Sequence, residues 1–454
     1  MDCTPNNLIN AASCFCGFNQ QNAVQIYLLC QWANNLTPPL PPFSWEPAIE
    51  NASWNDSGGF HIGDLATFNA ITSVTGIGTV TQITAGDWTA ANNIQSLTGL
   101  TSLDVSNTLM LSVDVSGMTS LVSLACQLGT FTSINVTGCT SLTGIICHTN
   151  PALTTISGLA SCTNLATLTF YDCDITGTLD CGGLANLTSV TCYNNLNLTS
   201  IDVAGCAALV TFECNTCDIT GTLNLSGLAN LTTLNCSLNP NLTGLTLTGC
   251  AALVTLDCYS CNITGSLDCS DLSNLNSLQC LTNIGLTGLN LANAVLLTYL
   301  DASSCDLTGT IDLTDQTILV TALLNTNPNL NSVLVTGLTV LDSLNLNDCD
   351  LNVLLDLSTC SSISNLQIQN SANLTALNIG SSNLQTVVDV FGCGLVNFPN
   401  GVDNILSLLE TNCLANTGLV DVSAGTNAPP DVGPPDGITA AANLTLAGWT
   451  VVTN

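Results

Sequence analysis

A unit of about 22 residues recurs through most of this chain, and it constrains the fold more than any other feature. In one copy Leu231, Leu234, Cys236 and Asn239 fill an L-x-x-L-x-C-x-x-N frame, and the frame begins again at Leu253, 22 residues later. Side chains alternate across a strand, so residues two apart at the centre of the frame share one face of a short strand. One unit cannot bury that face alone, whereas a stack of units can.

The frame recurs at steps of 21 to 23 residues and loses definition near Gln385 and Ile405. Its last position, which falls in a turn, alternates between asparagine and cysteine. The first position falls at Leu100, Leu121, Leu142, Leu165, Leu187, Leu209, Leu231, Leu253, Leu275, Leu297, Leu319, Leu341 and Ile363. The turn position holds Asn150, Cys173, Asn195, Cys217, Asn239, Cys261, Asn283, Cys305, Asn327, Cys349, Ser371 and Cys393.

This frame resembles the leucine-rich repeat signature, L-x-x-L-x-L-x-x-N/C-x-L. The resemblance implies a curved solenoid with a parallel sheet on its concave side. The chain departs from the family in the second half of each unit, which reads as a strand instead of a helix, as at Ile201-x-Val203 and Leu245-x-Leu247. We therefore expect a second sheet on the back. A right-handed parallel β-helix is the alternative fold.

The predicted fold is mainly β, a leucine-rich-repeat-type solenoid of about 15 turns with parallel sheets, preceded by a short α-helical hairpin. Residues 1–35 are assigned to the hairpin, 36–98 to a Pro-rich spacer and N-terminal cap, 99–425 to the solenoid and 426–454 to a C-terminal cap. Within the last segment, residues 436–447 are expected to form a helix and residues 448–453 a strand.

Residues 1–35 also resemble, more loosely, leader segments of structural proteins of tailed bacteriophages. That resemblance implies an anchor that docks on a virion or assembly protein, while a cap on the end of the solenoid is the alternative. The residues assigned to the anchor are Leu8, Ile9, Phe15, Tyr27, Leu28 and Trp32.

Charge excludes several functions. The chain has no Lys or Arg and 31 acidic residues, for a formal net charge of −31. Without cations it cannot hold a nucleic acid backbone or be attracted to an anionic membrane, and no apolar run is long enough to insert into one. A chain free of trypsin sites is suited to a virion surface or an extracellular location. Homo-oligomerisation is left open.

The 25 cysteines mostly follow the repeat period, which indicates buried free thiols that act as small hydrophobes. No cofactor is predicted. Calcium is the one metal considered, because aspartates recur at one outward position of the back strands. These aspartates are Asp114, Asp180, Asp202, Asp268, Asp312 and Asp356.

The residues two, four and six positions after the first leucine of each frame are expected to lie on the exposed side of the concave sheet. Tyrosine is enriched at binding surfaces, and beside carboxylates it suits a host glycan or protein, although Tyr also simply prefers strands. The candidate ligand-binding residues are His148, Tyr171, Tyr193, Glu213, Asp257, Tyr259, Tyr299 and Asp301.

Glu213, Asp257 and Asp301 lie 44 residues apart, or two turns, which predicts separations of about 9.6 Å from the strand spacing. This is the upper edge for an inverting glycosidase pair. The main prediction is a non-enzymatic display or adhesion protein that binds a host glycan or protein. The alternatives are a purely structural decoration or fibre subunit of a phage particle, and a glycan-hydrolysing spike.

Overall fold

The computed structural model describes residues 36–37, 73–74, 101–107, 111–380, 387–395, 401–413, 418–424, 427–432 and 436–454. The chain divides into two compact units, Met1–Asp218 and Ile219–Asn454. The predicted helical hairpin and its anchor residues Leu8, Ile9, Phe15, Tyr27, Leu28 and Trp32 lie outside the described residues, so the anchor stays a prediction.

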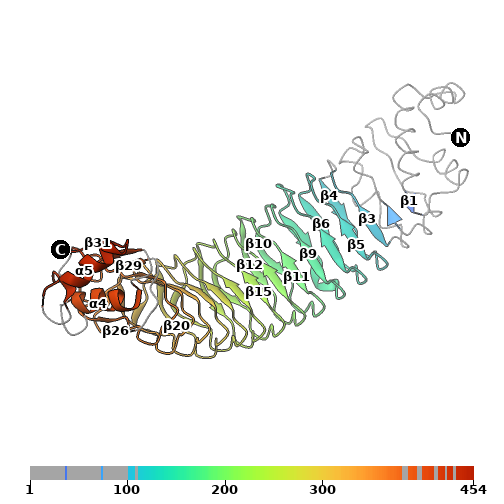
Figure 1. The fold of residues 1–454 in the computed structure, drawn as a ribbon. Coiled ribbons are helices and arrows are strands. Elements are labelled where there is room, and N and C mark those ends of the chain that lie inside the picture. The colour runs from blue at the N-terminus through green and yellow to red at the C-terminus, as the bar shows by residue number, and fades with distance from the viewer. Residues whose placement is uncertain are drawn as a thin grey trace, which may run out of the picture. The chain divides into compact units, whose positions relative to one another are not determined.

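In the first unit, each turn contributes one short strand to a parallel front sheet (Figure 1). Neighbouring strands pair in register, so that Val190 lies beside Phe212. The front strands are β2 (Ser73–Val74), β3 (Ser102–Asp104), β5 (Ser123–Ala125), β7 (Gly144–Ile146), β9 (Thr167–Thr169), β11 (Ser189–Thr191) and β13 (Thr211–Glu213), and β1 (Leu36–Thr37) pairs antiparallel with β2. The remaining elements are β4 (Ser112–Asp114), β6 (Ser133–Asn135), β8 (Thr155–Ser157), the 3₁₀ turn η4 (Leu159–Ser161), β10 (Gly177–Asp180) and β12 (Leu198–Asp202).

The second unit continues the same plan and ends in two helices. Its front strands are β15 (Thr233–Asn235), β17 (Thr255–Asp257), β19 (Ser277–Gln279), β21 (Tyr299–Asp301), β23 (Thr321–Leu323), β25 (Ser343–Asn345), β27 (Asn365–Gln367), β29 (Val387–Asp389), β30 (Leu419–Asp421) and β31 (Thr450–Val452). Its back strands are β14 (Gly221–Asn224), β16 (Leu242–Thr246), β18 (Thr264–Asp268), β20 (Gly285–Asn290), β22 (Thr308–Asp312), β24 (Asn329–Leu334), β26 (Leu355–Asp356) and β28 (Leu377–Asn378). The helices are α4 (Val402–Cys413) and α5 (Gly437–Leu446).

The back strands correct one expectation, because they do not form one continuous sheet among the described residues. They form the three-stranded sheet β4–β6–β8 and the pairs β10–β12, β14–β16, β18–β20, β22–β24 and β26–β28. Four of these pairs shift register at a glycine with positive φ, such as Gly265 (φ 74°). A bulge disrupts a ladder locally, so a bulge in alternate turns limits the pairing.

The turns are regular. Thirteen non-glycine residues with φ between 52° and 62°, from Asn107 to Asn370, recur one turn apart and precede the frame's turn position. The described residues therefore form about 13 regular turns, close to the expected 15. Inward frame positions, for example Leu234, Leu256 and Cys258, are fully buried.

Buried asparagine and cysteine alternate at the turn position because both satisfy main-chain groups there. The Asn195 amide donates to the carbonyls of Phe170 (3.0 Å) and Cys192 (2.9 Å), and its oxygen accepts from the Ile175 N–H (3.1 Å). In the next turn the Cys217 thiol donates to the Cys192 carbonyl at 3.4 Å. Every buried main-chain N–H and carbonyl group needs a hydrogen-bond partner. The two residue types provide these partners and so connect successive turns by hydrogen bonds.

The 20 cysteines from Cys126 to Cys393 whose side chains are described are free and buried, which confirms the thiol prediction for this part of the chain. Burial raises the pKa of the Cys206 and Cys217 thiols to about 11. It raises the pKa of Cys192 and Cys258 well above the ordinary thiol range. The thiolate is the reactive form of cysteine. Because the raised pKa keeps these thiols protonated at neutral pH, the residues contribute to packing.

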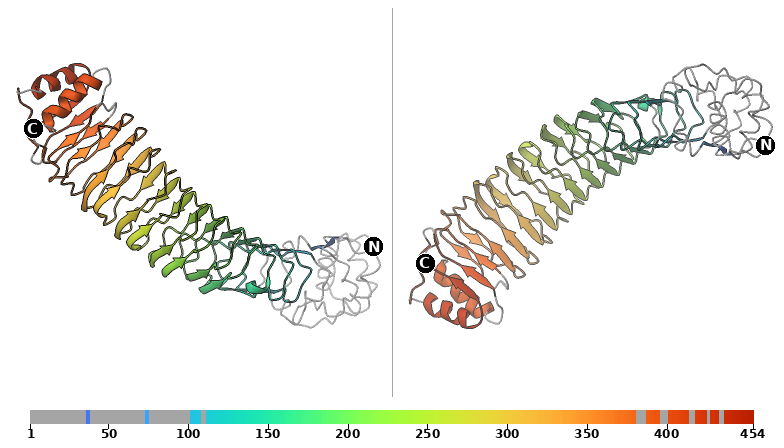
Figure 2. Two further views of the ribbon diagram at one scale, coloured as in Figure 1. Left: turned by 90° about the horizontal axis from the view of Figure 1, so that it is seen from below. Right: turned by 90° about the horizontal axis from the view of Figure 1, so that it is seen from above.

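The C-terminal end matches the prediction in part (Figure 2). Helix α5 begins after Asp436, whose carboxylate accepts the Thr439 N–H as an N-cap, and β31 follows as the last parallel strand. Helix α4 lies where the solenoid was expected to continue. Ile405, Leu406 and Leu409 bury one face of α4, a helical spacing that the strand frame obscured.

Candidate functional site

Three aromatic side chains form a stacked column on the front sheet of the first unit. Each ring lies two residues after the end of a front strand: His148 follows β7, Tyr171 follows β9 and Tyr193 follows β11. The ring centroids of His148 and Tyr171 are 4.4 Å apart with 5° between the planes, and those of Tyr171 and Tyr193 are 4.6 Å apart with 8°. All three side chains are half-buried. We call these residues the aromatic column.

The repeat builds this column from local geometry. In-register parallel strands place equivalent side chains about 4.8 Å apart, close to the stacking distance of two rings. The residue after each ring has positive φ, which holds the turn in the same conformation each time. The His148 Nδ1 lies 3.0 Å from the Thr149 hydroxyl, and the Asn194 amide donates to the Asp172 carboxylate at 2.6 Å. The second of these contacts links the residues that follow Tyr171 and Tyr193 in consecutive turns.

The stacking decides what the column can offer to a ligand. The faces of Tyr171 are covered by its neighbours, so only the outer faces of His148 and Tyr193 are free of ring contacts within the column. The column therefore presents mainly ring edges and polar tips. Burial raises the pKa of Tyr193, and the nearby Tyr171, Asp172 and Glu213 act in the same direction. The phenol consequently stays protonated at neutral pH and can donate a hydrogen bond.

The sequence analysis missed one residue at this site. Gln127 occupies the frame position of His148 one turn earlier, and its Oε1 is buried without a hydrogen-bond partner among the described residues. Native structures rarely leave such an acceptor unpaired. The frame itself would have pointed to Gln127. Glu213, which was predicted, lies half-buried at the end of β13 in the same unit.

The predicted residues of the second unit do not form a comparable column. Tyr259 lies in the turn after β17, and Tyr299 is the first residue of β21. Neither ring stacks on another ring within the described residues. The Gln279 amide donates to the Asp257 carboxylate at 3.0 Å. Burial raises the pKa of Asp257, and the bond from Gln279 opposes that shift.

The spaced carboxylates are poorly arranged for hydrolysis. Asp301 is only 8% exposed, and its Oδ1 accepts from the Ser303 N–H (3.1 Å) and hydroxyl (2.7 Å). Strand β19 with Gln279 lies between Asp257 and Asp301. A glycosidase needs one carboxyl as acid and one as base or nucleophile, both facing the substrate. Because Asp301 holds its own turn, this geometry weakens the hydrolase alternative.

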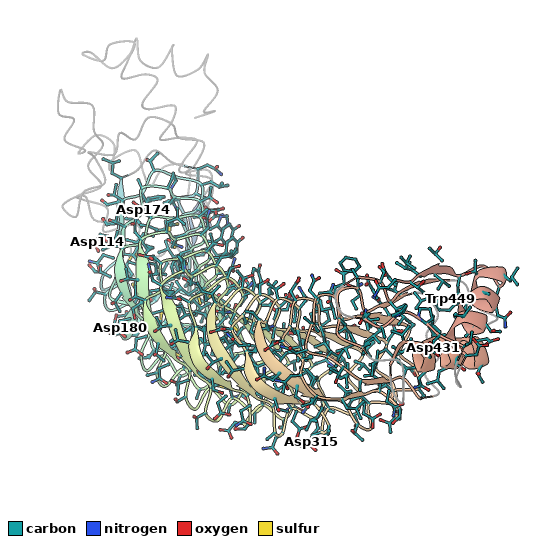
Figure 3. The ribbon with its side chains drawn as sticks, turned by 90° about the vertical axis from the view of Figure 1, so that its left-hand side faces the viewer. Asp114, Asp174, Asp180, Asp315, Asp431 and Trp449 are labelled. Atoms are coloured by element: carbon teal, nitrogen blue, oxygen red, sulfur yellow. The ribbon has the colours of Figure 1, made fainter. Side chains whose placement is uncertain are left out.

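The recurring back-strand aspartates have a structural explanation. Each accepts the N–H of the residue two positions later at 2.9 or 3.0 Å, which caps the turn after the strand. This holds for Asp114, Asp180, Asp202, Asp268, Asp312 and Asp356. Figure 3 shows the labelled Asp114 and Asp180 at the surface. No group of three His, Cys, Asp or Glu in the described part of the chain is placed to hold a metal ion.

Three solved structures are similar to this chain to different degrees. The functional domain of InlJ from Listeria monocytogenes, which includes a cysteine ladder, is 28% identical with a TM-score of 0.55, covering 82% of this chain and 79% of that one. A leucine-rich repeat protein from Leptospira interrogans is 17% identical (TM-score 0.41; 71% and 91% covered). YopM from Yersinia enterocolitica is 18% identical (TM-score 0.43; 66% and 71% covered).

No protein-family model matches the chain, and the search of curated proteins gave no match. No described helix has the length and apolar character needed to cross a membrane. With the parallel front strands and the asparagine–cysteine turns, the InlJ likeness confirms a leucine-rich-repeat-like solenoid. The chain is therefore a mainly β repeat protein.

Proposed function

We propose that this chain is a non-enzymatic adhesion or display protein that binds a protein partner through the aromatic column of its first unit. The observation that carries the proposal is the stack of His148, Tyr171 and Tyr193 on an exposed face. Aromatic residues are enriched at the centres of protein interfaces, where rigid rings bury area at little entropic cost. The likeness to InlJ is compatible with such a role.

A glycan ligand is the second candidate. A sugar ring that stacks on an aromatic residue needs an open ring face, and in the column the rings contact one another on their inner faces. The outer faces of His148 and Tyr193 leave room for two such contacts at most. The stacking therefore favours a protein over an oligosaccharide as the partner.

We further propose an extracellular or virion-surface location. The absence of Lys and Arg supports this, as does the loose resemblance of residues 1–35 to tailed-bacteriophage leader segments. In that setting residues 1–35 dock on a virion or assembly protein while the repeats recognise the host. A purely structural fibre or decoration subunit is the alternative, and it requires no specific ligand.

A paired screen tests the proposed function. The full chain is probed against a yeast-displayed library of random cyclic peptides and against a glycan array. We expect enriched peptides whose binding disappears when Tyr171 and Tyr193 are both replaced by alanine. Glycan hits that depend on the same tyrosines would overturn the protein-partner assignment. Absence of any tyrosine-dependent hit in both screens would favour the purely structural role.

A further inference from the structure

In the second unit, one position of the repeat holds a different kind of residue in three consecutive turns than in the other turns. The residue immediately before the first leucine of the frame is small or polar in four turns of this unit, at Asn230, Ala252, Asn274 and Ser362. The Asn274 side chain donates to the Ala251 carbonyl of the preceding turn at 2.9 Å. In three consecutive turns between these, the position instead holds Leu296, Ile318 and Val340.

These three aliphatic side chains are exposed and adjacent. They are 40% to 44% exposed, and Val295 and Val320 beside them are 45% and 41% exposed. The backbone N–H of Val320 donates to the Thr298 carbonyl, and the Asp342 N–H donates to the Val320 carbonyl, both at 2.9 Å. Neighbouring turns are thus hydrogen-bonded at this place, and equivalent side chains lie about 4.8 Å apart. We call these five residues the aliphatic ridge.

The fold does not require the ridge. Asparagine at the same position bonds to the preceding turn, so a polar residue is compatible with this backbone. Single exposed aliphatic residues are ordinary, whereas a contiguous apolar patch on a soluble surface marks an interaction site. A run of three large aliphatic residues in a column that otherwise holds small or polar residues therefore indicates a surface that another molecule covers.

Charge identifies the class of molecule. Asp315 lies in the turn that leads to Ile318, and Asp342 follows Val340 by two residues. Both carboxylate side chains are exposed (Figure 3, Asp315). A second copy of this chain cannot neutralise them, because the chain has no Lys or Arg. A partner that supplies apolar side chains flanked by Lys or Arg complements both the ridge and its rim.

We propose that the aliphatic ridge docks a basic, apolar segment of a partner protein. The site lies wholly in the second unit, shares no residue with the aromatic column, and does not depend on the function proposed for that column. Burial of the ridge supplies affinity, and the aspartates at its rim select for cationic flanks.

A peptide-binding experiment tests the ridge. The probes are a synthetic peptide of alternating leucine and lysine blocks and a control peptide with serine in place of leucine. Binding to the full chain is measured by fluorescence anisotropy at 0.3 M salt, where exposed charges are largely screened. The variant Leu296→Asn/Ile318→Asn/Val340→Asn installs residues that the repeat already uses at this position. The matched control, Leu238→Asn/Val254→Asn/Ile284→Asn, removes three exposed aliphatic residues elsewhere in the unit.

We expect the leucine–lysine peptide to bind the unmodified chain and the control variant alike, and the ridge variant at least tenfold more weakly. Circular dichroism should show the same fold in all three proteins. Equal affinity for the ridge variant would overturn the proposal, as would equal binding of the serine–lysine peptide. Loss of a dimer in the ridge variant, measured by light scattering, would instead assign the ridge to a second copy.

Discussion

Replacing Tyr171 and Tyr193 together with alanine is expected to weaken binding of a selected peptide partner at least 100-fold. Aromatic residues at the centre of an interface commonly contribute about 2 kcal/mol each when truncated, and two such losses exceed a factor of 100. The two rings also stack on each other, so their removal exposes the remaining ring of His148 on the face that Tyr171 covered. Isothermal titration calorimetry with the purified chain measures the change.

The matched control replaces Tyr259 and Tyr299, which are half-buried on the second unit and unstacked among the described residues. This double variant should bind the same peptide with unchanged affinity. Similar losses in both double variants would show that the contact surface is not the aromatic column. The thermal unfolding transition should shift only slightly in either protein, because exposed cross-strand pairs contribute about 0.2 to 1 kcal/mol each.

Replacing Asn283 with alanine is expected to destabilise the second unit by about 3 kcal/mol or more. Its amide donates to the carbonyls of Cys258 (2.9 Å) and Cys280 (2.8 Å), and its oxygen accepts from the Ile263 N–H at 3.0 Å. The substitution leaves these buried groups without that partner, and each unsatisfied group costs about 1 to 3 kcal/mol. Urea unfolding followed by circular dichroism gives the change in midpoint.

Cys305→Ala provides the comparison for this substitution, one turn further along. The Cys305 thiol donates to the Cys280 carbonyl at 3.4 Å and to the Ser303 carbonyl at 3.6 Å, and thiol hydrogen bonds are weaker than those of an amide. Its loss should therefore cost clearly less than the loss of Asn283. Hydrogen exchange should show the Asn283→Ala effect concentrated in the adjacent turns, because each repeat contacts mainly its neighbours. Equal destabilisation by the two substitutions would contradict the assigned role of asparagine.

The front sheet and the turns were predictable because their physics is local. Period-2 spacing places Leu234 and Cys236 on the buried face, and the alternating Asn and Cys reflect the main-chain groups that each turn must satisfy. The cap at Asp436 was predictable from the same kind of local rule. Pairing of the back strands was not, because bulges at positions such as Gly265 depend on the conformation adopted beside the next turn.

Helix α4 was missed for a different reason. Ile405 suits both the repeat frame and a helical face with Leu406 and Leu409, and the periodicity of the preceding turns favoured the frame. At the site, the sequence predicted that the tyrosines share one face, but it did not predict which of the rings contact one another. Contact requires the same frame position in consecutive turns, which Tyr171 and Tyr193 satisfy and Tyr259 does not, since Ser237 and Leu281 flank it.

Hydroxyl-radical footprinting of the full chain with and without a selected peptide tests the central claim most directly. The method reports side-chain accessibility in the unmodified protein, so it does not depend on how a variant folds. We expect that binding protects His148, Tyr171 and Tyr193 from oxidation while Tyr259 keeps its reactivity. Protection of Tyr259 with unchanged oxidation of the column would contradict this expectation, and would place the recognition surface on the second unit.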